Sequence, residues 1–327
     1  MKKNIAVVAG GNSSEYQISI NSAHELSSNL DKKEYNVFTV IVKGSNWTVN
    51  YADEVISIDK NDFSFKSNGS KVIFDCALIA IHGTPGEDGK LQSYFDLLNI
   101  PYTSCNVFTS ALSFNKFACK NFLKEFGVKT AKSLLIRKEE AFDLDDILEK
   151  LKLPIFVKPN NSGSSYGISK VTERAELQTA IFNAFSEDEE IIIEEFIKGT
   201  EVSCGLFKTK SEKHIFPLTE IVSENDFFDY EAKYTVGKAT EITPAHIPDD
   251  LKQKCMDLSD LIYTKLGCNG IVRIDYIISS NTPYFLEINT VPGMSKESIV
   301  PKQIEAYGSK IGEMLDLVIK DTLIRNQ

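Results

Sequence analysis

Short runs of apolar, β-branched residues alternate with helical patterns through the first hundred residues, and this alternation restricts the possible folds more than any other feature. The runs lie at residues 5–9, 37–42 and 77–81, and the last of them ends at a glycine-rich turn. Strands that alternate with helices usually form a parallel sheet covered by helices. We therefore predict an α/β domain with a parallel sheet in this part of the chain.

The pattern changes after this first part. A helical pattern over residues 110–127 ends at Gly127, and a strand, a helix and a further strand follow it. The last third contains several strands, a helix near residues 249–266, a pair of strands around a short turn and a terminal helix. A chain of 327 residues is also too long for one small core, so a cleft between lobes is expected. We predict three α/β or α+β lobes, which comprise residues 1–105, 106–197 and 198–327.

The composition excludes several classes of protein. No apolar run approaches the roughly 20 residues that span a bilayer, which argues against a membrane protein. The net charge is -10 and no basic block is present, which argues against nucleic acid as a partner. The six cysteines form no C-x-x-C pair, so neither a zinc framework nor a disulfide scaffold is indicated. Reduced thiols fit a cytoplasmic protein best.

A lysine followed by small polar residues is the clearest local signal for a phosphate site. Lys158 ends an apolar strand, and the loop of residues 159–167 carries amides and hydroxyls that can surround phosphate oxygens. It is not a Walker loop, because the lysine precedes the loop and a strand follows it. On this segment alone, a surface turn explains the residues equally well.

Polar residues also alternate along the predicted pair of strands near the end of the chain. Arg273 and Asp275 are two apart, as are Glu287 and Asn289, so each pair lies on one strand face. Two carboxylates and an amide oxygen suit Mg²⁺, and the arginine can stabilise developing negative charge. Such alternation more often marks a solvent face. The loop that follows favours a site, because its amides and Ser298 can hold a carboxylate.

Two features near the N-terminus are ambiguous. The Gly-Gly turn at residues 10–11 lacks the G-x-G-x-x-G spacing of a dinucleotide site, which argues against NAD. Glu15 either favours the first turn of a helix or points into a cleft towards an ammonium group. His82 lies just after a predicted strand, at the edge where α/β sheets bind ligands, and is equally well a loop hydrogen-bonder.

A family resemblance joins these segments. In order and spacing, the chain resembles the D-alanine-D-alanine ligase family over nearly its whole length, through the segments AGGNSSEYQIS, IAIHGTPGEDGKLQ, PYTS, SALSFNKFACK, FVKPNNSGSSYGISKV, EEFIKGTEVS, FFDYEAKY, RIDY and FLEINTVPGMSKESIVP. The resemblance implies an ATP-grasp fold of three lobes with an N-terminal parallel-sheet (preATP-grasp) domain. It implies that ATP phosphorylates the carboxylate of one D-alanine, and that the amine of a second attacks the acyl phosphate. The products are a dipeptide for peptidoglycan precursors, ADP and phosphate.

The resemblance also implies roles for individual residues. The residues implied for ATP are Lys116, Lys158, Ser164, Glu194, Glu195, Ile197, Glu201, Phe227, Lys233 and Leu286. Those implied for the amino-acid substrates are Glu15, His82, Arg273, Gly293, Ser298 and Ile299. The implied metal ligands are Asp275, Glu287 and Asn289, for two Mg²⁺ ions that Mn²⁺ can replace. Those implied to act at the reacting centre are Glu15, His82, Ser164, Tyr234 and Arg273.

Several alternatives and one departure accompany the resemblance. Tyr234 favours D-alanine over D-lactate as the second substrate, so a D-alanine-D-lactate ligase is the close alternative, ahead of another ATP-grasp amino-acid ligase. A non-catalytic ATP-binding module is disfavoured, because Lys158, Arg273 and the metal set are all present. Tyr16 stands where the family usually has arginine, so any role of that arginine in anchoring Glu15 does not carry over. A homodimer is usual for relatives and is expected here.

Overall fold

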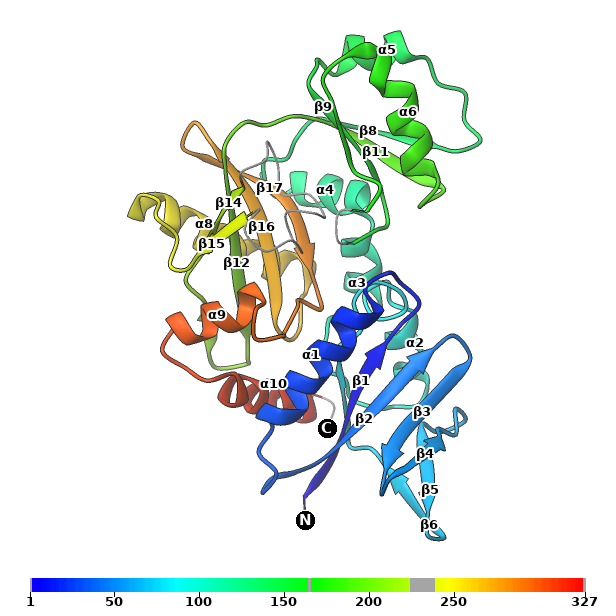
Figure 1. Ribbon diagram of the computed structural model, residues 1–327. Helices are drawn as coiled ribbons and strands as arrows, with labels where there is room; N and C mark the ends of the chain where they lie inside the picture. Colours follow the sequence, from blue (N-terminus) through cyan, green and yellow to red (C-terminus); the bar gives the residue numbers. More distant parts are fainter. Residues whose placement is uncertain (1, 164–165, 224–238, 326–327) are drawn as a thin grey trace.

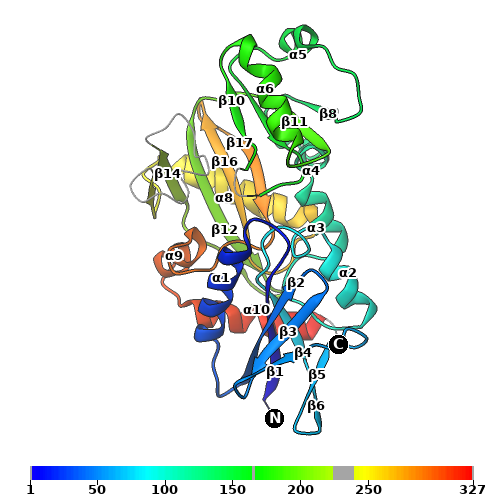
Figure 2. The same ribbon diagram turned by 45° about the vertical axis from the view of Figure 1, so that its right-hand side comes forward.

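The computed structural model describes residues 2–163, 166–223 and 239–325. Three bodies of secondary structure follow one another, each with its own main sheet (Figure 1). The N-terminal body lies at one end, the central lobe at the other and the C-terminal lobe between them, as the second view confirms (Figure 2). The mixed α/β fold predicted from the sequence is therefore confirmed. The strands of the main sheets fall within the three predicted ranges.

The N-terminal body is built around a five-stranded sheet in the order β4-β3-β2-β1-β7. The central strand β1 pairs in parallel with both β2 and β7, as the alternating pattern predicted, while β3 and β4 continue the sheet antiparallel. Its residues Ile5 and Val7 belong to one apolar core, and Ala6 and Val8 belong to another on the opposite face. The elements are β1 (Lys3–Gly10), α1 (Tyr16–Asn29), β2 (Tyr35–Lys43), β3 (Asn46–Tyr51), β4 (Glu54–Ser57), β5 (Ser64–Ser67), β6 (Ser70–Ile73), β7 (Cys76–Ile79) and α2 (Lys90–Leu97).

The central lobe carries a four-stranded antiparallel sheet in the order β10-β9-β11-β8. The single helix predicted over residues 110–127 is wrong, because two helices occupy this segment. Asn115 adopts an extended conformation between them and accepts a hydrogen bond from the Ala118 amide (2.9 Å), which starts the second helix. The elements are α3 (Val107–Phe114), α4 (Lys116–Lys124), β8 (Ser133–Arg137), α5 (Leu144–Lys150), β9 (Ile155–Pro159), β10 (Ser169–Val171), α6 (Arg174–Phe185) and β11 (Glu190–Glu195).

The C-terminal lobe holds a sheet in the order β15-β14-β12-β16-β17, with β13 beside β12. The predicted hairpin is present, and its turn residues Ser280 and Asn281 have positive φ angles of 48° and 59°. The terminal helix α10 packs back on the N-terminal body, where its Leu315 and Val318 share a core with Ile5 (Figure 1). The elements are β12 (Thr200–Lys208), β13 (Lys213–Ile215), β14 (Thr219–Ser223), β15 (Ala239–Ile242), α8 (Asp249–Leu266), β16 (Val272–Ser279), β17 (Thr282–Asn289), α9 (Ile299–Ala306) and α10 (Ile311–Arg325). No helix in the described ranges is long and apolar enough to cross a membrane.

Candidate active site

A cavity of about 1260 Å³ receives residues from all three bodies. Every site residue predicted from the sequence that lies in the described part of the chain lines it: Glu15, His82, Lys116, Lys158, Glu194, Glu195, Ile197, Glu201, Arg273, Asp275, Leu286, Glu287, Asn289, Gly293, Ser298 and Ile299. The predicted residues Ser164, Phe227, Lys233 and Tyr234 lie outside the described residues. The cavity thus brings together segments that are far apart in sequence.

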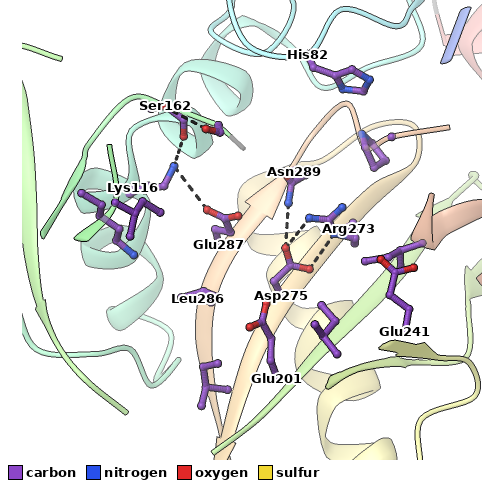
Figure 3. A pocket seen from close by; sticks show the side chains of 18 of the residues that line it. His82, Lys116, Ser162, Glu201, Glu241, Arg273, Asp275, Leu286, Glu287 and Asn289 are labelled. Atoms are coloured by element: carbon purple, nitrogen blue, oxygen red, sulfur yellow. Dashed lines mark hydrogen bonds and ion pairs between the residues drawn. The ribbon is translucent and has the colours of Figure 1, made fainter. Parts of the chain in front are cut away.

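The β16–β17 hairpin supplies the acidic part of the cavity. Asp275 stands directly opposite Glu287, and Arg273 stands opposite Asn289, so the period-two prediction holds across both strands. The register shifts between Asp275 and Tyr276, which makes β17 one residue longer over this stretch. Leu286 and Glu287 can therefore both line the cavity although they are adjacent in sequence (Figure 3). The irregularity lets one strand present an apolar and a charged side chain together.

Asp275 is the centre of a hydrogen-bond network on this hairpin. Arg273 binds it through two parallel bonds, from Nε to Oδ1 (2.9 Å) and from Nη2 to Oδ2 (2.8 Å). Ser203 Oγ donates to Oδ1 (2.6 Å) and Asn289 Nδ2 to Oδ2 (3.1 Å), as Figure 3 shows for the asparagine. Burial alone would lower the pKa of Arg273, but Asp275 raises it well above its usual range. The guanidinium is therefore charged and held in a fixed orientation.

The same network is compatible with a divalent cation. Asp275 and Glu287 offer carboxylate oxygens, and Asn289 donates through its nitrogen, so its Oδ1 is the atom that a cation would bind. Oxygen donors without histidine or cysteine suit Mg²⁺ rather than zinc. Lys116 Nζ lies 3.6 Å from Glu287 Oε2 and partly balances the charge of this group. The donor set therefore fits the ion that the sequence predicts.

Three lysines of the central lobe surround the other half of the cavity. Lys116, the first residue of α4, donates to the carbonyl of Ser162 in the loop after β9 (2.5 Å, Figure 3). Lys120, one turn further along α4, and Lys158, on β9, both form ion pairs with the carboxylate of Glu194 on β11. Burial alone would raise the pKa of Glu194, but the two ammonium groups lower it to about 2. The buried charges of Lys120, Lys158 and Glu194 are thus held together.

Lys120 is a cavity residue that the sequence reasoning missed. Its side chain is fully buried, and burial lowers its pKa to about 8 although Glu194 opposes the shift. It follows Lys116 by four residues, which places both side chains on the same face of a helix. That spacing is a signal which could have identified it. Glu194, which the resemblance implies for ATP binding, is here the common partner of two lysines.

Segments of the N-terminal body and of the C-terminal lobe form a further part of the cavity. Glu15, just before α1, lies against the loop after β9, because a side chain on Gly163 would meet its carboxylate. Gly293 lies against Ser298, whose hydroxyl a side chain at position 293 would approach to 2.9 Å. Ser298 precedes α9 and shares a hydrogen bond with Ser295 (2.8 Å between the oxygens). The carboxylate of Glu15 and the hydroxyls of Ser295 and Ser298 thus belong to residues that line the same cavity.

The family models locate this chain among known proteins. The model described as the D-ala D-ala ligase N-terminus matches residues 4–105, and the one described as the D-ala D-ala ligase C-terminus matches residues 122–320. The chain belongs to the D-alanine-D-alanine ligase family. The resemblance read from the sequence motifs is therefore confirmed, and the two matches cover most of the chain.

One relative and two solved structures support this membership. A relative from Parabacteroides distasonis, described as D-alanine--D-alanine ligase, is 50% identical over 325 residues, which are 99% of this chain and 98% of the relative. The crystal structure of the VanG D-Ala:D-Ser ligase from Enterococcus faecalis superposes with a TM-score of 0.88 at 31% identity, over 98% of this chain and 100% of that one. A D-alanine--D-alanine ligase from Bacillus anthracis complexed with ATP has a TM-score of 0.80 at 30% identity, over 99% of this chain and 98% of that one.

Proposed function

We propose that this protein joins two D-alanine molecules to D-alanyl-D-alanine at the expense of ATP, through a D-alanyl phosphate, and so supplies peptidoglycan precursors. One observation carries the proposal in a chain of this family: a single cavity holds buried lysines at one end and the Arg273–Gly293 region at the other. The first end suits nucleotide phosphates, and the second suits a reacting carboxylate. The carboxylates of Asp275 and Glu287 line the same cavity.

The nucleotide is proposed to lie between the central and C-terminal lobes. Lys116 and Lys158 offset the charge of its phosphates, while Glu201 and the Glu195–Ile197 segment face its ribose and base. Leu286 supplies an apolar contact to the purine. Asp275, Glu287 and Asn289 are proposed to hold two Mg²⁺ ions, for which Mn²⁺ can substitute. When bound, these ions would neutralise developing charge on the phosphates.

The chemistry follows from the weakness of a carboxylate as an electrophile. An oxygen of the first D-alanine carboxylate forms a bond to the γ-phosphorus of ATP, and ADP leaves. The amine of the second D-alanine then attacks the carbonyl carbon, loses a proton and displaces phosphate. Arg273 and the Gly293 amide are proposed to stabilise the oxyanion of the tetrahedral intermediate. Glu15 pairs with the first ammonium group, and Ser298 with the Ile299 amide holds the second carboxylate.

The second substrate is the part of this proposal that relatives most easily vary. The VanG relative is described as a D-Ala:D-Ser ligase, and Tyr234, on which the choice of D-alanine over D-lactate depends, lies outside the described residues. Incubation with ATP, Mg²⁺ and D-alanine, with D-serine, D-lactate or L-alanine as competitors, tests the choice. Phosphate release that requires D-alanine, with D-alanyl-D-alanine as the main product by mass, supports the proposal. A mixed product with D-serine or D-lactate, or turnover without D-alanine, overturns it.

Two further proposals concern the state of the protein in the cell. We propose a cytoplasmic location, because all six cysteines are buried free thiols. We propose a homodimer on the strength of the family resemblance. Sedimentation equilibrium tests the homodimer, and a monomer at micromolar concentration would contradict it.

A further inference from the structure

The loop after β17 crosses from the C-terminal lobe into the N-terminal body. We call residues 290–294 the bridging loop. Val291 belongs to the apolar core on one face of the N-terminal sheet, with Ala6, and Met294 belongs to the core on the opposite face, with Ile5. The bridging loop therefore contributes to the apolar cores on both faces of the N-terminal sheet, although its backbone continues from a strand of the C-terminal lobe.

Three polar side chains of the N-terminal body hold the backbone of the bridging loop. The carbonyl of Val291 lies 2.8 Å from His82 Nδ1, and the amide of Val291 donates to Glu87 Oε1 (3.2 Å). The amide of Met294 donates to Ser22 Oγ (3.3 Å). Both polar backbone atoms of Val291 are thus satisfied from another body, and so is the amide three residues later.

The hydrogen atoms in this network can be assigned from the partners. A carbonyl only accepts, so His82 Nδ1 carries the hydrogen. Burial lowers the pKa of His82, so its ring is neutral and Nε2 accepts from the hydroxyl of Ser22 (3.1 Å). The oxygen of Ser22 is then free to accept from the Met294 amide. Both ring nitrogens of His82 are engaged with the chain itself.

Glu87 completes the network through its second oxygen. Oε2 accepts from the amide of Gly83 (2.8 Å), next to His82, while Oε1 accepts from Val291. Burial and the nearby Glu15 raise the pKa of Glu87 to about 7, and the two amides oppose that shift. One carboxylate therefore ties the loop after β7 to the bridging loop.

We propose that Ser22 and Glu87 are positioning residues, which act with His82 to fix the Gly293 amide from the N-terminal body. The inference rests on the proposed function, in which that amide faces the oxyanion. Gly293 lies between the two anchored residues Val291 and Met294, and it packs against Ser298. His82 then acts through the bridging loop, with neither ring nitrogen directed to a substrate carboxylate. A displacement of the amide by about 1 Å is enough to cost about 100-fold in rate.

Nitrogen NMR of the histidine rings tests the network without turnover. The chain has four histidines, and His82 is assigned by the signal that a His82→Gln variant loses. In the free protein at pH 7, we expect the Nδ1–H tautomer for this ring, and a shift of its Nε2 signal in Ser22→Ala. An Nε2–H tautomer, or an Nε2 signal that Ser22→Ala leaves unchanged, would overturn the inference.

Steady-state kinetics test whether the network positions the reacting groups. Ser22→Ala should lower kcat about 100-fold and leave KM for ATP unchanged, because the other lobes hold the nucleotide. Glu87→Gln, which retains one acceptor for two amides, should lower kcat on the order of 10-fold.

The matched control is Ser19→Ala on the same helix. Ser19 is fully buried, and its hydroxyl bonds to Gly10 and Ala80 stay within the N-terminal body. Ser19→Ala should keep the wild-type kcat. An equal loss in Ser19→Ala and Ser22→Ala, or an unchanged kcat in Ser22→Ala, would contradict a positioning role. A wild-type protein without D-alanine ligation would instead refute the proposed function, and the ring tautomer would still decide on the network.

Discussion

Replacing Glu194 with glutamine should destabilise the protein strongly, because two lysines lose their shared counterion. The side chains of Lys120, Lys158 and Glu194 are 0%, 7% and 4% exposed. The pKa of Glu194 falls from 4.5 to about 2 although burial alone would raise it, so the folded protein favours the carboxylate over the neutral acid by roughly 3 kcal/mol. Removing one partner of a buried ion pair costs about 3 to 5 kcal/mol, which agrees with this figure. At about 2 to 4 °C per kcal/mol, the melting temperature should fall by roughly 6 to 12 °C.

The pH dependence of this loss distinguishes the ion pairs from general damage. A carboxylate whose folded pKa is lowered contributes its stability fully above the unfolded value of 4.5, and loses it as the pH falls towards 2. The gap in melting temperature between wild type and Glu194→Gln should therefore be wide at pH 6 and should narrow below pH 4.5. Differential scanning fluorimetry measures both.

The matched control for this variant is Glu189→Gln, which removes an exposed partner of Lys138 in the same lobe. The glutamate side chain is 77% exposed, so the melting temperature should stay close to that of the wild type. A Glu194→Gln protein that melts within 2 °C of wild type at pH 6, or one whose deficit is the same at pH 4 as at pH 6, would refute the reasoning.

Two further predictions concern the metal site and the thiols. Glu287→Gln should lower kcat at saturating Mg²⁺ by more than about 100-fold without a fall in melting temperature. The reason is that even residues which only contact a metal ligand contribute about 10- to 100-fold to metal affinity or activity. Retained turnover in this variant would remove Glu287 from the ligand set. The six cysteines are buried, and burial raises the pKa of four of their thiols to about 12: Cys76, Cys119, Cys204 and Cys255. No thiol of the native protein should therefore react rapidly with Ellman's reagent at pH 8, while all six should react in guanidinium. One rapidly reacting thiol in the native protein would contradict that burial.

Features that depend on local sequence were predicted well. The period-two spacing of Arg273 with Asp275 and of Glu287 with Asn289 placed each pair on one face of its strand, because strand geometry alone fixes that relation, and the register then brings the two pairs together. The apolar run at residues 5–9, which alternates with a helical pattern, likewise predicted the strand that pairs in parallel with both of its neighbours. Sequence patterns of this kind need no knowledge of distant contacts.

Features that depend on capping or on distant contacts were not predicted. Asn115 divides an apolar helical pattern because its side chain caps the following turn. The register shift that brings Leu286 beside Glu287 leaves no mark in a hydrophobicity pattern. The contact between His82 and Val291 joins residues 209 positions apart, so only the packed structure reveals it. Tertiary structure decides such details of the site.

The transfer of a carboxylate oxygen to phosphate tests the central claim most directly. The protein would be given ATP, Mg²⁺ and D-alanine that carries a heavy oxygen isotope in its carboxylate, and the released phosphate would be analysed by mass spectrometry. Attack of the carboxylate on the γ-phosphorus predicts that each phosphate released with a dipeptide contains one heavy oxygen. Phosphate without the label would show that water, and not D-alanine, attacks ATP, and label in AMP would show adenylation; either result would contradict the acyl-phosphate mechanism.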